Sequence, residues 1–347
     1  MATGRGGAPG RKLTLALGLL AGVHGVVLLA GFFAPYDPTV QDRARPFAPP
    51  TRLHLVDASG QLHLRPFVYR TFEREIGVFE EDRSRPYPLR FLVPSAPYRV
   101  AGLLVLHHRF FGVEEPARLF LLGTDGYGRD QLSRLLHGGQ ISLVAGLLAA
   151  GLSLGAGLVL GSVAGFFGRG LDALIMRGAE LFLALPWLYL LFAVRAVLPL
   201  HITPGQAFLL LVVVIGLVDW ARPARLVRGV VLSARERDYV RAARGFGASD
   251  LYLLRRHVVP QTFGVLLTQA ALLIPQYILA EVTLSFLGLG VSEPASSWGN
   301  MLGALQQYHV LASYWWMWVP GFALVPVFLG YYLLADVLHQ RARLEAL

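Results

Sequence analysis

The feature that most constrains this chain is a set of long apolar runs that contain no charged residue. Residues 141–167 form such a run of 27, residues 258–280 one of 23, and residues 13–34 one of 22. About 20 apolar residues in a helix cross the ~30 Å hydrocarbon core of a bilayer. Charged residues make up only 15% of the chain, against roughly a quarter in a soluble domain. The sequence therefore predicts an all-α polytopic membrane protein.

Three further stretches bring the predicted number of transmembrane helices to six. They are less regular than the first three, since they carry or border charged residues, four of them in the first stretch. They are residues 171–198, 206–222 and 311–335. The first run, 13–34, is longer than the 7–15 apolar residues of a typical signal peptide, and no small-x-small cleavage site follows it. We interpret it as an uncleaved anchor.

The distribution of basic residues predicts the orientation, because short cytoplasmic loops are enriched in Lys and Arg. Fifteen basic residues fall in the segments that lie inside when the N-terminus is cytoplasmic, namely 1–12, 168–170, 221–257 and 337–347. The short segments on the other side, 199–205 and 281–310, hold none. Both tails, 1–12 and 337–347, are thus expected in the cytoplasm. The long segment 35–121 is expected outside.

Several kinds of chemistry are excluded by residue types that are absent or rare. The chain has no cysteine, which rules out disulfides and thiolate ligands. Lys12 is the only lysine and is followed by Leu13, so the phosphate-binding pattern G-x-x-x-x-G-K-[ST] is absent. The net charge of +9 is concentrated in 221–257, beside membrane lipid, and does not indicate nucleic acid. We predict no catalytic residue, cofactor or metal, and any ATP hydrolysis must occur on another subunit.

The segment 35–121 is long for a connection between spans, and it is predicted to contain β-structure. Apolar residues alternate over 53–56 and 61–64 around a turn at 57–60, which predicts a β-hairpin. A centred turn places Leu55 opposite Leu62 and His54 opposite His63. Two histidines ~5 Å apart on one face could hold a metal, but no third ligand is evident. We favour a solvated pair in an extracytoplasmic insert.

The cytoplasmic segment 223–257 has a pattern that its positive charge alone does not explain. Asp238 is suited to cap the start of a helix. Ala242 and Ala243 give that helix a flat surface, and Gly247 suits a left-handed C-terminus. Ser249 or Asp250 can then begin the next helix. The pattern predicts a short cytoplasmic helix between two spans.

This segment resembles the EAA loop of type I ABC importer permeases, whose pattern is E-A-A-x-x-x-G followed by an apolar stretch and Pro. Here it reads Arg241-Ala242-Ala243, then Gly247 and finally Pro260, with Arg in place of the Glu. Further stretches are similar to the C-type permease subunits of dipeptide, oligopeptide and nickel importers, and these are 122–134, 172–186 and 281–302.

The resemblance implies a type I ABC importer fold with a transmembrane domain over 138–336. It implies that a coupling helix docks on a cytoplasmic ATPase, through Asp238, Tyr239, Arg241, Ala242, Ala243 and Gly247. It also implies several partners in a bacterial inner membrane: a B-type permease subunit, two ATPase subunits and an extracytoplasmic binding protein. The cargo is a peptide, nickel, an oligosaccharide or a related solute.

Some features remain open between two interpretations. Glycines recur every four positions from Gly157 to Gly165, preceded by the pair Gly151 and Gly155, and packing within the fold is favoured over a self-dimer. Charged residues in or beside spans face protein or a water-filled path. Glu281 fits a gating or folding role and a substrate contact equally, and Arg195 lies near the outer end of its helix. A membrane-embedded hydrolase and an ion-coupled carrier or channel are the rival functions, and copurification of an ATPase separates both from a permease.

Overall fold

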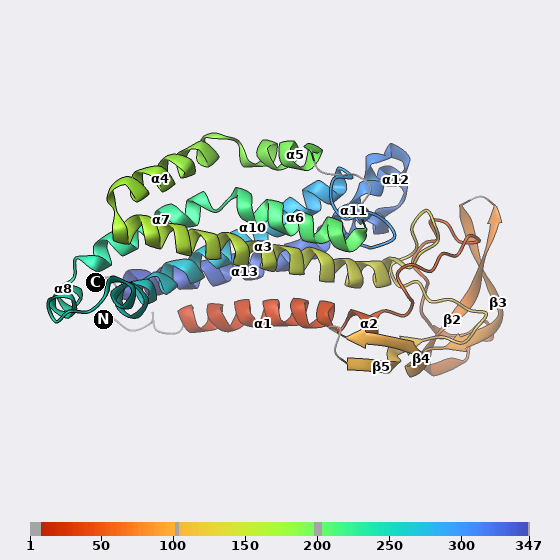
Figure 1. Cartoon of the computed structure of the whole chain (residues 1–347). Helices are drawn as coiled ribbons and strands as arrows, with labels where there is room; N and C mark the ends of the chain where they lie inside the picture. Colours follow the sequence, from red (N-terminus) through yellow and green to blue (C-terminus); the bar gives the residue numbers. More distant parts are fainter. Residues whose placement is uncertain (1–7, 76, 101–103, 198–202, 346–347) are drawn as a thin grey trace, which may run out of the picture. The chain divides into compact units, whose positions relative to one another are not determined.

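The computed structural model describes residues 8–75, 77–100, 104–197 and 203–345, which form long helices and a group of strands (Figure 1). The chain divides into two compact units. Unit 1 comprises Met1–Leu20, Val144–Leu284 and Pro326–Leu347, and unit 2 comprises Ala21–Leu143 and Ser285–Val325. The helices α1 (Ala8–Leu28), α3 (Gln131–Phe167), α10 (Phe263–Phe286) and α13 (Val319–Glu345) contribute residues to both units.

Four helical segments within the described residues are long and apolar enough to cross a membrane: Gly10–Leu28, Gln131–Phe167, Asp250–Phe286 and Trp315–Arg341. Two bent helix pairs raise this number to six if each pair forms one span. The helix predicted over 171–198 is one of these pairs. It consists of α4 (Arg169–Ala184) and α5 (Trp187–Val197), which meet at 90°. Pro186 explains the break, because a proline disfavours helical backbone at the preceding residue.

The second bent pair differs from its prediction at the C-terminal end. Helix α6 (Pro204–Val218) begins at a capping box formed by Thr203 and Gln206. Helix α7 (Ala221–Arg235) follows at an angle of 45°. The cytoplasmic segment predicted from residue 223 therefore begins inside this amphipathic helix. Its buried positions recur every three or four residues and include Ala224, Val227, Val231 and Ala234.

The short elements after α7 lead back into a long helix. They are α8 (Asp238–Gly245), α9 (Asp250–Leu253), the π-helical turn η1 (Leu254–Val258) and the 3₁₀ turn η2 (Val259–Thr262), followed by α10. In unit 2, α2 (Ala30–Phe33) follows α1. The segment after α10 forms α11 (Trp298–Gly303), η3 (Ala304–Gln306), α12 (Tyr308–Ser313) and η4 (Trp315–Trp318) before α13 begins.

The strands all lie between α2 and α3, in the segment predicted to contain β-structure. β1 (His54–Val56), β2 (Leu62–Glu75) and β3 (Val78–Pro88) form an antiparallel sheet in that order. β4 (Arg90–Val100) and β5 (Leu104–Gly112) form a separate antiparallel pair. A small apolar core of Val68, Tyr87, Ala117 and Leu119 packs beneath the strands. The burial of this core explains why the segment is folded and not an extended tether.

The predicted hairpin is present, but its predicted register is wrong. Val56 lies opposite Leu62 and His54 opposite Phe67, with an irregularity between these pairs. The two histidines therefore do not face each other. His54 Nε2 lies 2.9 Å from Glu81, and His63 Nε2 lies 2.8 Å from Asp57. Residues 57–61 form the turn between these strands, and the Asp57 carboxylate accepts hydrogen bonds from the backbone N–H groups of Ser59 and Gln61.

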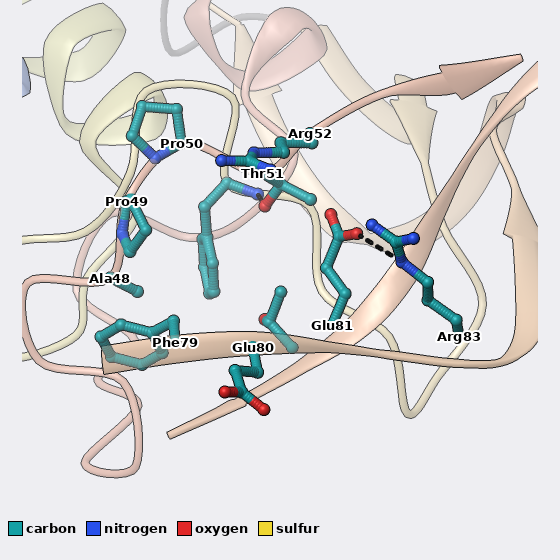
Figure 2. A pocket seen from close by; sticks show the side chains of 11 residues that line it. Ala48, Pro49, Pro50, Thr51, Arg52, Phe79, Glu80, Glu81 and Arg83 are labelled. Carbon is teal, nitrogen blue, oxygen red and sulfur yellow. Dashed lines mark hydrogen bonds and ion pairs between the residues drawn. The ribbon is translucent and has the colours of Figure 1, made fainter. Parts of the chain in front are cut away.

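A cavity of about 380 Å³ lies where the segment before β1 meets β3 (Figure 2). Pro49, Pro50 and Arg52 line one side, and Phe79 and Glu81 line the other. At its edge the backbones of Thr51 and Phe120 are hydrogen-bonded, with N···O 2.8 Å. The two ends of the strand-containing segment are thus held next to each other.

Candidate functional site

The candidate site is the short helix α8 together with the turn that follows it. Arg237 is the N-cap residue of α8, with extended backbone angles and no capping hydrogen bond from its side chain. The prediction that Asp238 caps the helix is therefore wrong. Asp238 is the first helical residue, where its charge is still favourable beside the free N–H groups of the first turn.

The C-terminus of α8 has the predicted left-handed geometry. Gly247 has φ +87°, and its N–H donates to Arg244 O at 3.0 Å. The N–H of Ala248 donates to Ala243 O at 3.1 Å, which completes a Schellman motif. The next helix begins at Ser249, whose side chain accepts a hydrogen bond from the Tyr252 N–H. Gly247 therefore fixes the direction in which the chain leaves α8.

One face of α8 attaches the helix to the rest of unit 1. Val240 is fully buried in a cluster that Ala243 and Ala248 cover from the side. The cluster draws its other members from α3, α7, α9 and η1, and they include Phe166, Val227, Val231, Leu253 and Val258. Of the predicted alanine pair, Ala243 thus faces inward and Ala242 is exposed.

A neighbouring face of α8, beside the buried one, is apolar and exposed. Tyr239, Ala242 and Phe246 have the spacing i, i+3, i+7, which places them on one side of a helix. Tyr239 is 41% exposed and Phe246 is 93% exposed. Phe246 was not among the predicted site residues. Its position next to a helix-ending glycine was the available signal, but the sequence does not show whether such a residue turns inward.

Arginines surround this apolar face, and several are paired with acids of the same segment. Arg241, which stands in place of the expected Glu, donates to Glu236 at 2.8 Å. That hydrogen bond lowers the pKa of Glu236 below its ordinary value. Arg244 lies 3.2 Å from Asp250. Arg237 is exposed at the start of the helix. The rim of the site is therefore basic.

Helix α7 connects the site to two other helices of unit 1. Arg228 makes a bidentate ion pair with Asp172 of α4, with N···O distances of 2.5 and 2.6 Å. Arg235 donates to the backbone oxygens of Gly165 and Phe166, at the end of α3, at 2.8 and 3.3 Å. Helix α7 is thus fixed to α4 and to the end of α3 by side-chain contacts.

The glycine series of α3 packs against α7, which runs beside it (Figure 1). A Cβ on Gly161 would lie 2.4 Å from the carbonyl oxygen of Ala224, and one on Gly157 would lie 2.7 Å from Pro223. Close approach of the two backbones therefore requires these glycines. Gly151 and Gly155 have open space instead. The favoured interpretation, packing within the fold, holds for the part of the series nearest α7.

The remaining predicted residues lie apart from α8. Glu281 is completely buried within α10, which continues to Phe286 beyond the predicted helix end. The side chain of Arg195 lies outside the described side chains. Asp219, at the break between α6 and α7, is also buried. Its Oδ2 lies 3.1 Å from the Tyr277 hydroxyl, which is in turn 2.9 Å from Ser153 Oγ. The described residues include no group of three or more His, Asp or Glu side chains placed to hold a metal.

A short helix with an exposed apolar face, attached to helices long and apolar enough to cross a membrane, is the arrangement of a polytopic membrane protein. Residues 157–344 match the family described as binding-protein-dependent transport system inner membrane component, and the chain belongs to this family. It is a permease subunit of an ABC importer.

Named relatives support the same assignment. The chain is 40% identical over 219 residues to a peptide permease protein of Brucella suis, covering 63% of this chain and 70% of the relative. It is 39% identical over 221 residues to the di/tripeptide transport system permease protein DppC of Pseudomonas aeruginosa, covering 64% of this chain and 71% of that one. Among solved structures, it is similar to the inward-facing MetNI methionine ABC transporter, with a TM-score of 0.45, 17% identity and coverage of 60% of this chain and 94% of that chain.

Proposed function

We propose that this chain forms half of the translocation path of a peptide importer and that α8 receives the motion of a cytoplasmic ATPase. The observation that carries this proposal is the exposed apolar face of Tyr239, Ala242 and Phe246 on a helix whose other face is buried. A phenylalanine that is 93% exposed loses hydrophobic free energy unless a partner covers it. The names of the relatives support a peptide cargo.

The charge around α8 indicates the chemistry of the surface that receives it. Residues 235–256 contain six arginines and three acids. Two of those acids are already paired with Arg241 and Arg244. The complementary surface is therefore an apolar pocket for Phe246 with an acidic rim. Such rim charges speed and orient association more than they add affinity.

Variants of the exposed face test the docking directly. Phe246→Ala removes the central anchor, which typically costs ~2 kcal/mol or more at an interface, or about 30-fold in affinity. Ala242→Trp adds volume to the same face. Both variants should fold, insert and pair with the partner permease, because neither side chain packs within the chain. Capture of the ATPase and ATP-driven uptake should fall together.

Arg241→Ala is the matched control on the same helix. Its side chain is exposed and pairs with Glu236, also exposed, so the loss should be small. Normal ATPase capture by Phe246→Ala and Ala242→Trp would contradict docking through this face. Ala243 is unsuitable for this test, because it faces the chain's own core.

We also propose six membrane spans with both termini in the cytoplasm. The support is the basic residues of the inside segments and the two bent helix pairs, each counted as one span. The absence of cysteine allows single-cysteine labelling without background. A cysteine at Ser84 should react with a membrane-impermeant maleimide from outside, and one at Ser233 only from the cytoplasmic side. The reverse pattern would contradict the orientation.

The strand-containing insert is proposed to lie outside and to seat a binding protein that delivers the substrate. Its cavity between Pro49 and Glu81 supports this role, since it offers apolar and charged walls to an incoming segment (Figure 2). The Thr51–Phe120 hydrogen bond allows residues 53–118 to be replaced by a short Gly/Ser bridge. Uptake at limiting binding protein should then fall while ATPase capture stays intact. Unchanged uptake would exclude the docking role.

The proposed complex contains a B-type permease subunit as the other half of the path and two ATPase subunits that carry out all ATP hydrolysis. Reconstituted uptake identifies the cargo. We expect labelled di- and tripeptides to be transported, and transport of nickel or an oligosaccharide without peptides would contradict the peptide assignment.

A further inference from the structure

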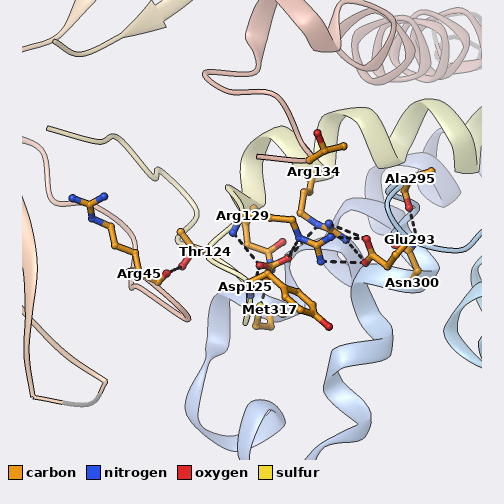
Figure 3. A network of polar contacts seen from close by, with 12 residues as sticks. Arg45, Thr124, Asp125, Arg129, Arg134, Glu293, Ala295, Asn300 and Met317 are labelled. Atoms are coloured by element: carbon orange, nitrogen blue, oxygen red, sulfur yellow. Dashed lines mark hydrogen bonds and ion pairs between the residues drawn. The ribbon is translucent and has the colours of Figure 1, made fainter. Parts of the chain in front are cut away.

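A second polar cluster lies in unit 2, where the segment before α3 meets the loop after α10 (Figure 3). Arg129 Nε donates to Asp125 Oδ2 at 2.7 Å, and its Nη1 and Nη2 donate to Glu293 at 2.5 and 3.1 Å. Arg134 Nη2 donates to the same Glu293 at 2.9 Å. Two guanidinium groups thus hold one carboxylate from a distant part of the chain.

The members of this cluster differ in burial. The side chains of Arg129, Arg134 and Asp125 are 6%, 2% and 7% exposed, whereas that of Glu293 is 48% exposed. The Asp125 carboxylate is fixed further by the N–H groups of Tyr127 and Arg129. Arg129, Arg134 and Asp125 therefore form a rigid buried group, and Glu293 is the member that can dissociate from it.

Charge balance shows which further charge this buried group requires. Two guanidinium groups and one carboxylate leave a net charge of +1, which one further carboxylate neutralises. Glu293 supplies that carboxylate now. Paired Arg side chains bind a carboxylate bidentately, and such charge-assisted hydrogen bonds are about twice as strong as neutral ones. A second carboxylate of similar geometry can replace Glu293 at little net cost, because Glu293 regains water when it leaves.

A cavity of about 390 Å³ adjoins the cluster and is lined by Arg129, Arg134, Glu293, Gln131 and Asn300. This volume is within the range of pockets that hold small ligands. The Gln131 side chain is 2% exposed, and its Nε2 donates to Met317 Sδ. Its Oε1 has no hydrogen-bond partner among the described residues. A buried acceptor without a donor favours a ligand that brings an N–H group into the cavity.

We propose that Arg129 and Arg134 form a carboxylate-binding subsite that Glu293 occupies at rest, and that the C-terminal carboxylate of a short peptide displaces Glu293 and releases the loop 287–297. This inference deepens the proposed peptide transport and rests on it. The backbone N–H of the same peptide then reaches Gln131 Oε1. The loop is thereby coupled to the presence of a substrate with a free carboxylate.

The loop contains a suitable reporter position. Ser296 is 4% exposed, and its hydroxyl has no hydrogen-bond partner among the described residues, so Ser296→Cys is a mild change. The purified full chain is otherwise free of cysteine. The rate of maleimide labelling at this position then reports how often the loop opens. Trialanine should raise this rate, whereas trialanine amide, which lacks the carboxylate, should not.

The variant Glu293→Gln provides the second part of the experiment. In the Ser296→Cys background it should raise the labelling rate about tenfold or more without any peptide, because the charge-assisted bonds to both arginines are weakened. It should also increase the thermal stabilisation of the chain by trialanine, since the site then keeps its +1 charge. A merely structural role for Glu293 does not produce that gain in peptide binding.

Glu114→Gln is the matched control. Glu114 is half-exposed and forms an ion pair with Arg90, with an N···O distance of 2.9 Å, and neither residue lines the cavity. It should leave labelling unchanged. An equal response to trialanine and its amide, or an unchanged rate and unchanged peptide stabilisation in Glu293→Gln, would overturn the proposal. The assay needs neither ATPase nor binding protein. Its failure is therefore distinguishable from failure of ATPase capture or of peptide uptake.

Discussion

Substituting Gly161 by alanine is the sharpest test of how α3 packs against α7. The new Cβ would lie 2.4 Å from Ala224 O, 2.9 Å from Val227 Cβ and 3.1 Å from Ala224 C, whereas ordinary contact begins at 3.4 Å. The clash is with backbone, so no side chain can turn aside. The two helices must separate by roughly 1 Å at this point. Overpacking of this kind typically costs 1–3 kcal/mol.

Gly155→Ala on the same helix is the control. No atom lies within 4 Å of a Cβ at Gly155, so only the intrinsic helix preference of alanine changes. That preference favours Ala over Gly by about 0.5–1 kcal/mol, and it is common to both variants. The difference between the two therefore isolates the clash. Gly161→Ala should be less stable than Gly155→Ala by ~1–3 kcal/mol.

The assay is unfolding of the purified chain in detergent, followed by circular dichroism over a denaturant series. Reconstituted uptake gives a second readout, because α7 leads from Gly161 to α8. Gly161→Ala should lower uptake and Gly155→Ala should not reduce the stability of the chain. Equal stability of the two variants within about 0.5 kcal/mol would refute the packing of α7 on the glycine face.

Three further predictions follow from other contacts. Asp172→Asn breaks the bidentate pair with Arg228 and should destabilise the chain by about 1.5–3 kcal/mol in the same unfolding assay, whereas Asp336→Asn, at an exposed pair, should cost at most about 1 kcal/mol. Gly247→Ala meets no steric neighbour but must adopt φ +87°, so it should cost about 1 kcal/mol and weaken ATPase capture. Burial raises the pKa of Asp130 from 3.8 to about 7. The stability of the parent chain should therefore fall as pH rises through that range, because the buried neutral carboxyl is lost. Asp130→Asn cannot ionise, so in thermal melts its stability relative to the parent chain should increase between pH 4 and pH 7.

Each of these predictions has a result that would contradict it. Equal losses for Asp172→Asn and Asp336→Asn would show that the bidentate, partly buried pair has no special weight. Normal capture of the ATPase by Gly247→Ala would show that the direction of the chain after α8 does not matter. A constant difference between Asp130→Asn and the parent chain over pH 4 to 8 would show that folding does not raise the pKa of this carboxyl.

Local features of the sequence were sufficient for the apolar helices and for the end of α8. Each span must by itself keep charges and unpaired backbone groups out of the hydrocarbon. A charge-free run therefore predicts a span without knowledge of its neighbours. Gly247 was predictable for a similar reason, because left-handed geometry is disfavoured for every residue that has a Cβ. Both features depend on a few consecutive residues.

The errors arose where two or more local solutions compete. Asp238 can cap a helix, but Arg237 takes the N-cap position and Asp238 becomes the first helical residue. The cytoplasmic segment predicted from residue 223 begins within α7, because the apolar face of α7 packs on α3 and keeps these residues helical. The alternating pattern of β1 and β2 predicted a hairpin, while its register is set by a turn over 57–61 and an irregularity between the pairs of His54 and Val56.

Only the tertiary structure decided which distant residues meet. Arg129 and Glu293 are 164 positions apart, and Ser153 and Tyr277 are 124 apart. Neither pair follows from a spacing along the chain. Whether Phe246 is exposed was likewise undetermined, because the same apolar residue gains free energy in a core or in a partner's pocket. A sequence pattern records the preference of a residue to be buried, but the packing of the helices determines what buries it.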